Sequence, residues 1–397
     1  MVRMVASHMA RVRCRVCLVK PKKDFIVGWR KDMEDSHFEM LSVSESTDDS
    51  LFAVFDGHGG SAVARFCSEH FPAVLLQDPD FVNGGVAEGL RRTYLKLDEM
   101  LQDPGIFQEL KKYSKGKNSS SGGDTPPVTK RPVNANPALT AGCTAVVVHV
   151  HNKTLTVANS GDSRAVLCRD GQAIDLTVDH KVTLESEVSR ISAAGGIVLN
   201  GRVNGSLNLT RAIGDLAFKG DASLPPEGQV ITANPDVYVM ELDPESDDFV
   251  VLACDGLWEV MTSQEVVDFV SHGLRGIRGD FPASPDSTSS NPPASISELI
   301  GKLLDVACSD DVGKTEGLGG DNLTCIIVDL RPGLPLSNIE RVSKLDEGGE
   351  FVLKPNSYRA FEFRSNSGSS SSSDAFTKTD DFECRIEKLD YTSIHHS

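Results

Sequence analysis

The sequence of 397 residues has few aromatic residues, no long hydrophobic run and no pairing pattern among its nine cysteines. Aromatic residues make up 6% of the chain, which argues against an aromatic platform for stacking nucleic-acid bases. No apolar run approaches the roughly 18 residues of a membrane-spanning helix, and the N-terminus lacks the apolar core of a secretory signal. We therefore expect a soluble intracellular protein, cytoplasmic or nuclear, without a disulfide framework or a membrane partner.

Acidic residues outnumber basic ones by 57 to 40, which gives a formal net charge of −17. This charge repels a phosphate backbone, so we expect no nucleic-acid partner. The first 23 residues are an exception, because they contain Arg and Lys but neither Asp nor Glu. Such a segment is typical of a flexible basic arm, and organellar targeting by the basic N-terminus is the alternative.

Between residues 24 and 331, strand-like apolar segments alternate with amphipathic ones, which predicts a large folded domain. Strands are predicted at 51–55, 144–150, 154–158, 164–168, 249–253 and 323–328, and helices at 61–76, 86–101, 184–194, 264–274 and 296–307. A short polar turn separates the second and third strands, which predicts a hairpin and an antiparallel sheet. The mixed order of strands and helices favours the α+β class over a doubly wound sheet.

Other segments lack this pattern. Ser, Gly and Pro are enriched at 115–137 and at 280–293, so these segments are predicted to be inserted loops within the domain. Residues 332–397 include a run of serines and are predicted to form a low-complexity, disordered tail. Together with the basic arm at 1–23, this organisation leaves 24–331 as the only predicted globular part.

Several predicted strands have an aspartate at one end. Asp56 and Asp255 each begin an Asp-Gly pair after an apolar strand, Asp162 follows another strand, and Asp321 precedes one. Carboxylates at strand ends can converge at one rim of a sheet, where they repel one another unless a cation intervenes. Hard divalent cations prefer such oxygen ligands, so the joint pattern predicts a Mg²⁺ or Mn²⁺ site. Each Asp-Gly taken alone is also a common turn signal.

Six motifs follow one another along the chain: GWRKDMED (28–35), LFAVFDGHGG (51–60), ANSGDSRAVL (158–167), GRVNGSLNLTRAIGD (201–215), LACDGLWEVM (252–261) and GGDNLTC (319–325). In this order they closely resemble the metal-dependent type 2C serine/threonine protein phosphatases. The resemblance covers about residues 25–331. Two further segments, LPPEGQVITANPDV (224–237) and SQEVVDFV (263–270), are most similar to the gamma-type branch of that family.

The resemblance implies two packed, mainly antiparallel β-sheets flanked by helices, an αββα sandwich, with two Mg²⁺ or Mn²⁺ ions at one end. It implies that Asp56 bridges both ions and that the carbonyl oxygen of Gly57 binds one of them. The other ion would be bound by Asp255 and Asp321. Asp162, together with Asp255, matches the weaker third metal site of the family.

The same resemblance implies that Glu34 and Asp35 hold metal-bound waters. Arg30 would bind the substrate phosphate, since its planar guanidinium suits two phosphate oxygens. A salt bridge from Arg30 to Glu34 at helical spacing is the alternative. His58 would protonate the leaving group, because the pKa of an ordinary imidazole, roughly 6.5, allows proton transfer near neutral pH. The alternative for His58 is an ordinary loop residue.

The implied activity is metal-dependent hydrolysis of phosphoserine and phosphothreonine in proteins by a metal-bridged hydroxide, without a covalent enzyme intermediate. Its partners would be phosphoprotein substrates, and the enzyme is expected to be a monomer. A catalytically inactive phosphatase-like scaffold is one alternative, because only residues 23–27 stand where the family usually has a regular strand. An NAD-binding oxidoreductase is a second, because Gly57, Gly59 and Ala62 form GxGxxA between a predicted strand and a helix.

Overall fold

The computed structural model describes residues 15–16, 25–43, 49–114, 136–278 and 295–331. The chain divides into two units, Met1–Tyr358 and Arg359–Ser397, and every described residue lies in the first. The predicted tail, the predicted loop at 280–293, residues 115–135 of the other loop and most of the predicted arm lie outside the described residues.

Two antiparallel sheets lie at the centre of the fold. The first contains β3 (Ser36–Met40), β4 (Asp49–Phe55), β7 (Ala145–His151), β8 (Thr154–Ser160) and β14 (Asp236–Glu241). The second contains β1 (Arg15–Val16), β2 (Phe25–Ile26), β9 (Arg164–Arg169), β10 (Gln172–Asp175), β15 (Asp247–Ala253) and β16 (Leu323–Asp329). Their orders are β14-β8-β7-β4-β3 and β1-β16-β15-β9-β10, with β2 also paired to β16. The predicted hairpin is formed by β7 and β8.

Strand β4 shows why the predicted apolar runs are uninterrupted. Phe52 and Val54 pack into a core that contains residues of both sheets, such as Leu252 of β15. Leu51 and Phe55 point to the opposite face and join a second core. Because side chains alternate across a strand, a strand that is buried on both faces has no polar positions.

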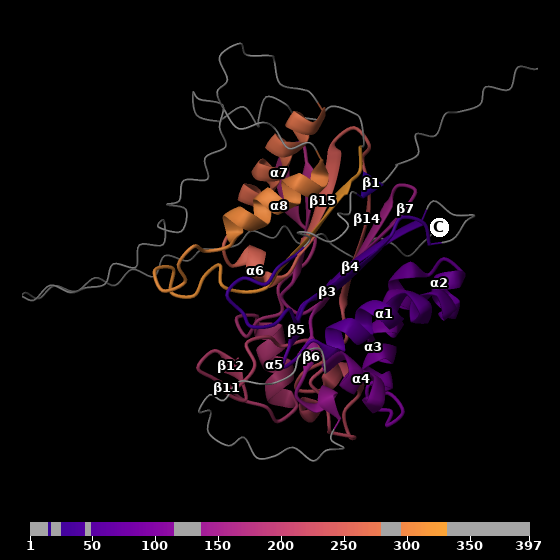
Figure 1. The fold of residues 1–397 in the computed structure, drawn as a ribbon. Coiled ribbons are helices and arrows are strands. Elements are labelled where there is room, and N and C mark those ends of the chain that lie inside the picture. Colours follow the sequence, from indigo (N-terminus) through magenta and orange to yellow (C-terminus); the bar gives the residue numbers. More distant parts are fainter. Residues whose placement is uncertain (1–14, 17–24, 44–48, 115–135, 279–294, 332–397) are drawn as a thin grey trace, which may run out of the picture. The chain divides into compact units, whose positions relative to one another are not determined.

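Helices cover both outer faces of this pair of sheets. The α-helices of the described residues are α1 (Ala62–Gln77), α2 (Pro79–Val82), α3 (Val86–Met100), α4 (Phe107–Ser114), α5 (Glu185–Ala193), which lies away from the two sheets, α6 (Asp255–Trp258), α7 (Ser263–Arg278) and α8 (Ile296–Ala307). Helices α1 and α3 pack on the first sheet, and α7 and α8 pack on the second (Figure 1). The predicted α+β sandwich of helix, sheet, sheet and helix layers is confirmed.

Two short strands form the edge of the second sheet next to β16. Phe25–Ile26 pairs with the start of β16, and Arg15–Val16, inside the segment predicted to be an arm, pairs with its end. The edge position that precedes the GWR motif is therefore occupied. The pairing of β2 with β16 fixes the direction in which the chain enters the turn that contains Arg30.

The topology excludes the dinucleotide-binding alternative. Gly57, Gly59 and Ala62 do lie between β4 and α1, but β4 pairs antiparallel with both of its neighbours, β3 and β7. The dinucleotide fold requires a parallel strand after the helix. The GxGxxA spacing therefore belongs to the turn between the antiparallel strand β4 and helix α1, and not to a dinucleotide-binding turn.

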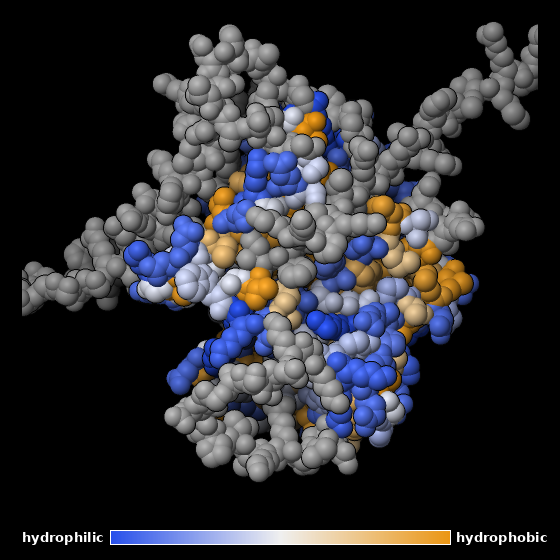
Figure 2. All heavy atoms as spheres, in the orientation of Figure 1, coloured by the Kyte–Doolittle hydropathy of each residue, from blue (hydrophilic) through white to orange (hydrophobic). Residues whose placement is uncertain are grey.

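The outer surface in Figure 2 is mostly hydrophilic, with small separate hydrophobic patches, one of them over α2. This helix carries Val82, which is 66% exposed. None of the helices in the described residues combines the length and the apolar character that crossing a lipid bilayer requires.

A buried ion-pair network fastens α5 to the segment that contains Arg211. The carboxylate of Glu187 is 1% exposed and accepts hydrogen bonds from Arg211 at 2.8 Å, Arg190 at 2.5 Å and the Thr210 hydroxyl at 2.6 Å. Burial alone would raise the pKa of Glu187, but these partners, Arg211 above all, lower it to about 2. The ionised form is therefore strongly favoured in the folded protein.

We expect Glu187→Gln to lower the free energy of unfolding at pH 7 by roughly 3 kcal/mol. The pKa of Glu187 in the folded protein lies below its usual value of 4.5, so this contribution is present above pH 4.5 and is lost as the pH falls toward 2. Urea unfolding of both proteins at pH 7 and pH 3 measures the difference, which should shrink at the lower pH. Glu185→Gln, at an exposed position of the same helix, is the matched control and should change little. A difference that is equal at both pH values contradicts this account.

Candidate active site

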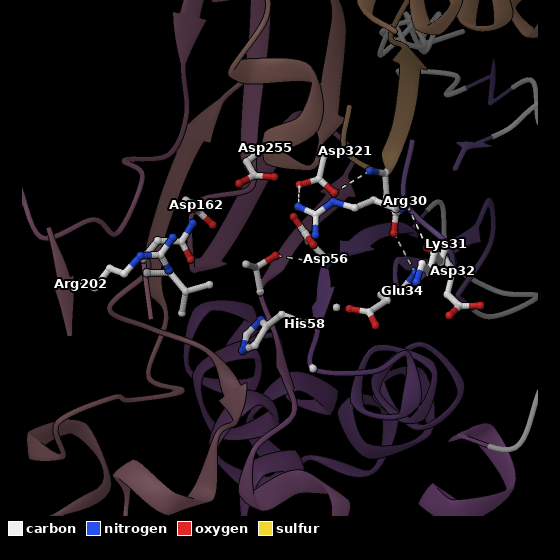
Figure 3. Close-up of a pocket in the computed structure, with 16 residues that line it drawn as sticks. Arg30, Lys31, Asp32, Glu34, Asp56, His58, Asp162, Arg202, Asp255 and Asp321 are labelled. Atoms are coloured by element: carbon white, nitrogen blue, oxygen red, sulfur yellow. Dashed lines mark hydrogen bonds and ion pairs between the residues drawn. The ribbon is translucent and has the colours of Figure 1, made fainter. Parts of the chain in front are cut away.

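Side chains from distant parts of the chain line one cavity of about 440 Å³. The predicted residues among them are Arg30, Glu34, Asp56, Gly57, His58, Asp162, Asp255 and Asp321. Figure 3 shows the carboxylates of Asp56, Asp162, Asp255 and Asp321 around the same space, with His58 on the opposite side from Asp255 and Asp321. Asp35 is buried close to Asp56 and Asp321 and is the one predicted residue that does not line the cavity.

The strand pairing explains this convergence. Asp255 follows β15 and Asp321 precedes β16, and these two strands are antiparallel with Ala253 opposite Cys325. The end of one strand therefore lies beside the start of the other. In the first sheet, Asp56 follows β4, and its carbonyl oxygen accepts a 2.9 Å hydrogen bond from the backbone nitrogen of Thr144. The aspartates that the sequence places at strand ends thus meet at one rim.

We call Asp35, Asp56, Asp162, Asp255 and Asp321 the acid cluster. Burial raises the pKa of Asp56 well above its usual range, and the negative charges of Asp35, Asp255 and Asp162 raise it further. Burial, followed by the charge of Asp162, likewise raises the pKa of Asp255. Burial also raises the pKa of Asp35, to about 6. Without a cation, the ionised form of this cluster is strongly disfavoured.

Two oxygens of the cluster have no hydrogen-bond partner in the described residues. Asp35 Oδ2 accepts from the Thr324 hydroxyl at 2.6 Å, but Oδ1 has no donor. Asp162 Oδ2 also has no hydrogen bond, and its nearest cation is the Lys181 ammonium at 3.5 Å. Buried acceptors without a donor are uncommon in folded proteins, and a hard cation or its bound water supplies what they lack.

Within the described residues, no three acidic, His or Cys side chains are close enough to one another to bind the same metal ion. One reason is visible at Asp321, whose Oδ2 accepts a 2.5 Å hydrogen bond from the Arg30 guanidinium. A divalent cation in the cavity would compete with Arg30 for this carboxylate. The carboxylate oxygens that line the cavity are donors of the kind that Mg²⁺ and Mn²⁺ prefer.

The pairing of Arg30 with Asp321 bears on the predicted salt bridge between Arg30 and Glu34. Asn322, which is 6% exposed, connects the segment of Arg30 to the loop of Asp321. Its side chain donates to the carbonyl oxygens of Val27 and Asp32 and accepts from the backbone nitrogen of Glu34 at 2.9 Å. The segment is a turn and not a helix, so the predicted alternative of an Arg30–Glu34 salt bridge at helical spacing is wrong.

Gly57 shows how closely two segments approach in the cavity. A Cβ atom at this position would lie 2.2 Å from the carbonyl oxygen of Glu34. Any other residue here would push the Glu34 segment away, so only glycine allows this contact. The short strand β5 (Gly57–His58) pairs with β6 (Gly142–Cys143), which fixes the backbone on the other side.

His58 is held by a partner that the sequence did not reveal. Its Nε2 lies 2.5 Å from Oδ2 of Asp215, and the Asp215 side chain is 2% exposed. Burial alone would lower the pKa of His58, but the hydrogen bond to Asp215 and the surrounding negative charges raise it above its usual value of 6.5. His58 thus lies in the short strand β5 and has a buried acidic partner.

Other lining residues were also missed. They are Lys31, Asp32, Gly59, Thr144, Arg202, Asn208, Leu209 and Asn322. Arg202 and Asn208, like Asp215, lie inside the matched motif at 201–215, and Asn322 lies inside the motif at 319–325. The motifs were a usable signal for these positions, but they assigned no role to them.

The family model described as "Protein phosphatase 2C" matches residues 22–291. The chain belongs to the protein phosphatase 2C family. It is 38% identical over 321 residues to "Probable protein phosphatase 2C 11" of Oryza sativa subsp. japonica, covering 77% of this chain and 83% of the relative. It is 40% identical over 304 residues to "Probable protein phosphatase 2C 3" of Paramecium tetraurelia, covering 77% and 90%.

A solved structure of a phosphatase from a pathogenic strain of Toxoplasma gondii shares the fold. The TM-score is 0.56 at 24% identity, and the match covers 77% of this chain and 91% of the other. As a member of the protein phosphatase 2C family, the chain is a protein serine/threonine phosphatase that depends on Mg²⁺ or Mn²⁺ and acts on phosphoproteins. Asp321 lies beyond the residues that the family model matches, yet the structure brings it into the same cavity.

Proposed function

We propose that this phosphatase hydrolyses phosphoserine and phosphothreonine at a two-metal centre, with Asp56 as the ligand shared by both ions. The Gly57 carbonyl would complete the site of one ion, and Asp255 and Asp321 that of the other. The observation that carries this proposal is the shared cavity of these carboxylates, whose mutual repulsion calls for cations. When bound, two such ions lower the pKa of a shared water from about 15.7 toward neutrality and supply hydroxide for in-line attack on phosphorus.

The remaining acids of the site have supporting roles in this proposal. Asp35 and Glu34 would hold waters of the metal ions, and the free Oδ1 of Asp35 supports this role. Asp162, which is 1% exposed, and Asp255 would form the weaker third site. The close Lys181 ammonium partly neutralises Asp162, which is consistent with a weaker hold on a cation there.

Arg30 is placed to bind the phosphate group. Its side chain is 61% exposed and already reaches the cavity, where it pairs with Asp321. A cation on Asp321 would release the guanidinium, whose planar fork can then bind two phosphate oxygens. Binding of metal and binding of substrate are thereby coupled through one carboxylate.

A mechanism without a covalent intermediate agrees with the chemistry of the cavity wall. The described lining residues include no Cys or Ser, and the Thr144 hydroxyl lies within hydrogen-bonding distance of the Ser163 hydroxyl, at 2.7 Å. Cys254 is buried close to Asp35 and Asp56, and burial raises the pKa of its thiol well above the usual range. Cys254 is therefore not available as a thiolate for attack. His58 would deliver the proton to the departing Ser or Thr oxygen.

We further propose that the enzyme belongs to the gamma-type branch of the family. The support is the pair of segments at 224–237 and 263–270, the second of which forms the start of α7.

The full chain should release phosphate from a phosphothreonine peptide when Mn²⁺ or Mg²⁺ is added. EDTA should stop the reaction, and excess metal should restore it. Asp321→Asn should abolish turnover because it removes a metal ligand, whereas Asp311→Asn, in the same loop and paired with Lys314, should not. Titration calorimetry with Mn²⁺ provides the parallel binding measurement. Metal binding without any phosphate release would favour the inactive scaffold.

A further inference from the structure

The imidazole of His58 lies between the cavity and a buried carboxylate. His58 lines the cavity and its side chain is 26% exposed, whereas Asp215 does not line the cavity and its side chain is 2% exposed. A carboxylate can only accept, so the 2.5 Å contact requires Nε2 to donate to Asp215 Oδ2. The His58 side chain makes no other hydrogen bond within the described part of the chain, which leaves Nδ1 available.

Asp215 is held in place by the backbone. It follows β13 (Ile213–Gly214), which pairs with β6, and β6 also pairs with the strand of His58. The backbone nitrogen of Asp215 donates to the carbonyl oxygen of Ala141 at 2.9 Å. Its φ of 49° lies in the left-handed region, which costs a residue other than glycine roughly 1 kcal/mol or more. The fold maintains this conformation, and the conformation places the carboxylate behind the imidazole.

Gly142 leaves room for this contact. A Cβ atom on Gly142 would lie 2.4 Å from Asp215 Oδ2 and 2.8 Å from His58 Nε2. The central strand of this small sheet therefore has no side chain at the one position where a side chain would separate the two groups. Three segments of the chain, around residues 58, 142 and 215, therefore meet at the hydrogen bond between His58 and Asp215.

We propose that Asp215 is the positioning residue for His58: its hydrogen bond to Nε2 fixes the orientation of the ring. This inference rests on the proposed function, in which His58 protonates the leaving oxygen. As hydroxide derived from water forms a new bond to phosphorus, the bond from phosphorus to the Ser or Thr oxygen breaks and its electron pair stays on that oxygen, which takes the proton from Nδ1 of the imidazolium. The products are the alcohol, phosphate and a neutral imidazole whose Nε2–H still donates to Asp215.

A purely structural role for Asp215 is the competing explanation, and a neighbouring ion pair offers a control for it. Asp98, 7% exposed, accepts from the backbone nitrogen of Gly214 at 2.8 Å and from the Lys219 ammonium at 2.7 Å. This buried carboxylate supports the same segment as Asp215 but does not touch His58. Asp98→Asn should therefore affect stability without affecting proton transfer.

The test compares two substrates of the Mn²⁺-loaded full chain that differ only in the leaving group. Phenyl phosphate has a strongly basic leaving group that needs a proton, and p-nitrophenyl phosphate has a weakly basic one that does not. We expect Asp215→Asn to lower kcat for phenyl phosphate about 30-fold or more, and kcat for p-nitrophenyl phosphate less than about threefold. Gly142→Ala should change the ratio in the same direction, because the added methyl group separates the pair.

His58→Gln should give the same split between the substrates, with metal affinity nearly unchanged. The double variant His58→Gln/Asp215→Asn should be no slower than His58→Gln alone, because both substitutions impair the same proton transfer to the leaving oxygen. Asp98→Asn should lower Tm and leave the ratio of the two rates at the wild-type value.

Equal losses on both substrates for Asp215→Asn, or losses that multiply in the double variant, would overturn the positioning role. If Asp215→Asn does not fold, Gly142→Ala takes its place, and an unchanged rate ratio there has the same meaning. If His58→Gln itself leaves the ratio unchanged, the acid role of His58 fails as well. Absence of any metal-dependent turnover in the wild-type protein would instead contradict the proposed function.

Discussion

We expect Asp56→Asn to lower metal-dependent phosphate release about a thousandfold or more and, at the same time, to stabilise the metal-free protein. An amide is a poor replacement for a carboxylate shared by two cations. Loss of about 4 kcal/mol of charge stabilisation in the transition state corresponds to this change in rate. Few substitutions should change activity and stability so strongly in opposite directions.

The gain in stability follows from the charges around Asp56. Burial raises its pKa well above the usual range, and Asp35, Asp255 and Asp162 add to the effect. A neutral amide of the same size removes this repulsion. The Tm of the EDTA-treated protein measures the gain, and kcat with a phosphothreonine peptide measures the loss of activity.

Asp162→Asn is the matched comparison for Asp56→Asn. It also removes a buried acid of the cluster, but from the proposed weaker third site, so its kinetic defect should be much smaller. Comparable kinetic defects in the two variants would contradict the hierarchy of sites. A metal-free Asp56→Asn protein that is less stable than the wild type would contradict the electrostatic account.

The second large effect is a loss of stability in the metal-free protein as the pH rises. Burial raises the pKa of Asp35 from its usual 3.8 to about 6, and it raises the pKa values of Asp56 and Asp255 well above that usual value. The folded protein therefore keeps protons that the unfolded chain has already released. Its free energy of unfolding falls as the pH rises through this interval, by roughly 3 kcal/mol for Asp35 alone.

Mn²⁺ should reverse this trend, because the cation replaces the protons on the acid cluster. We expect the increase in Tm on adding Mn²⁺ to grow from pH 5 to pH 8. Differential scanning calorimetry with EDTA or with Mn²⁺ at each pH provides the measurement. In Asp56→Asn, the metal-free profile should be flatter. An increase in Tm that is independent of pH in the wild type would show that the cluster does not hold these protons.

The sequence predicted the strands that are buried on both faces. Strands β4, β7, β15 and β16 have apolar side chains on both sides, and such runs are visible without a structure. β3 and β14 were not predicted, because their sequences SHFEM and DVYVME mix polar and apolar residues. β14 pairs with β8 at the edge of the first sheet and remains largely exposed, so its formation depends on a neighbour and not on its own composition.

The part of the site that could be predicted from the sequence consists of aspartates at the ends of apolar strands. Asp56, Asp255 and Asp321 flank buried strands, so their convergence follows from the sheets. The partner of His58 was not predictable, because Asp215 reaches it from 157 residues further along the chain through a turn of unusual backbone conformation. The pairing of Arg30 was missed for a similar reason: it depends on the turn that Asn322 holds.

The side chain of Asn322 has a consequence for the order in which the enzyme becomes competent during synthesis. It joins the turn at residues 27–34 to a loop almost 300 residues later, and that loop also provides Asp321. A ribosome-bound chain that has not yet exposed this loop lacks both a proposed metal ligand and the hydrogen bonds that hold the turn of Arg30, the proposed phosphate-binding residue. We therefore expect catalytic competence only after β16, the last strand in the described residues, has been synthesised.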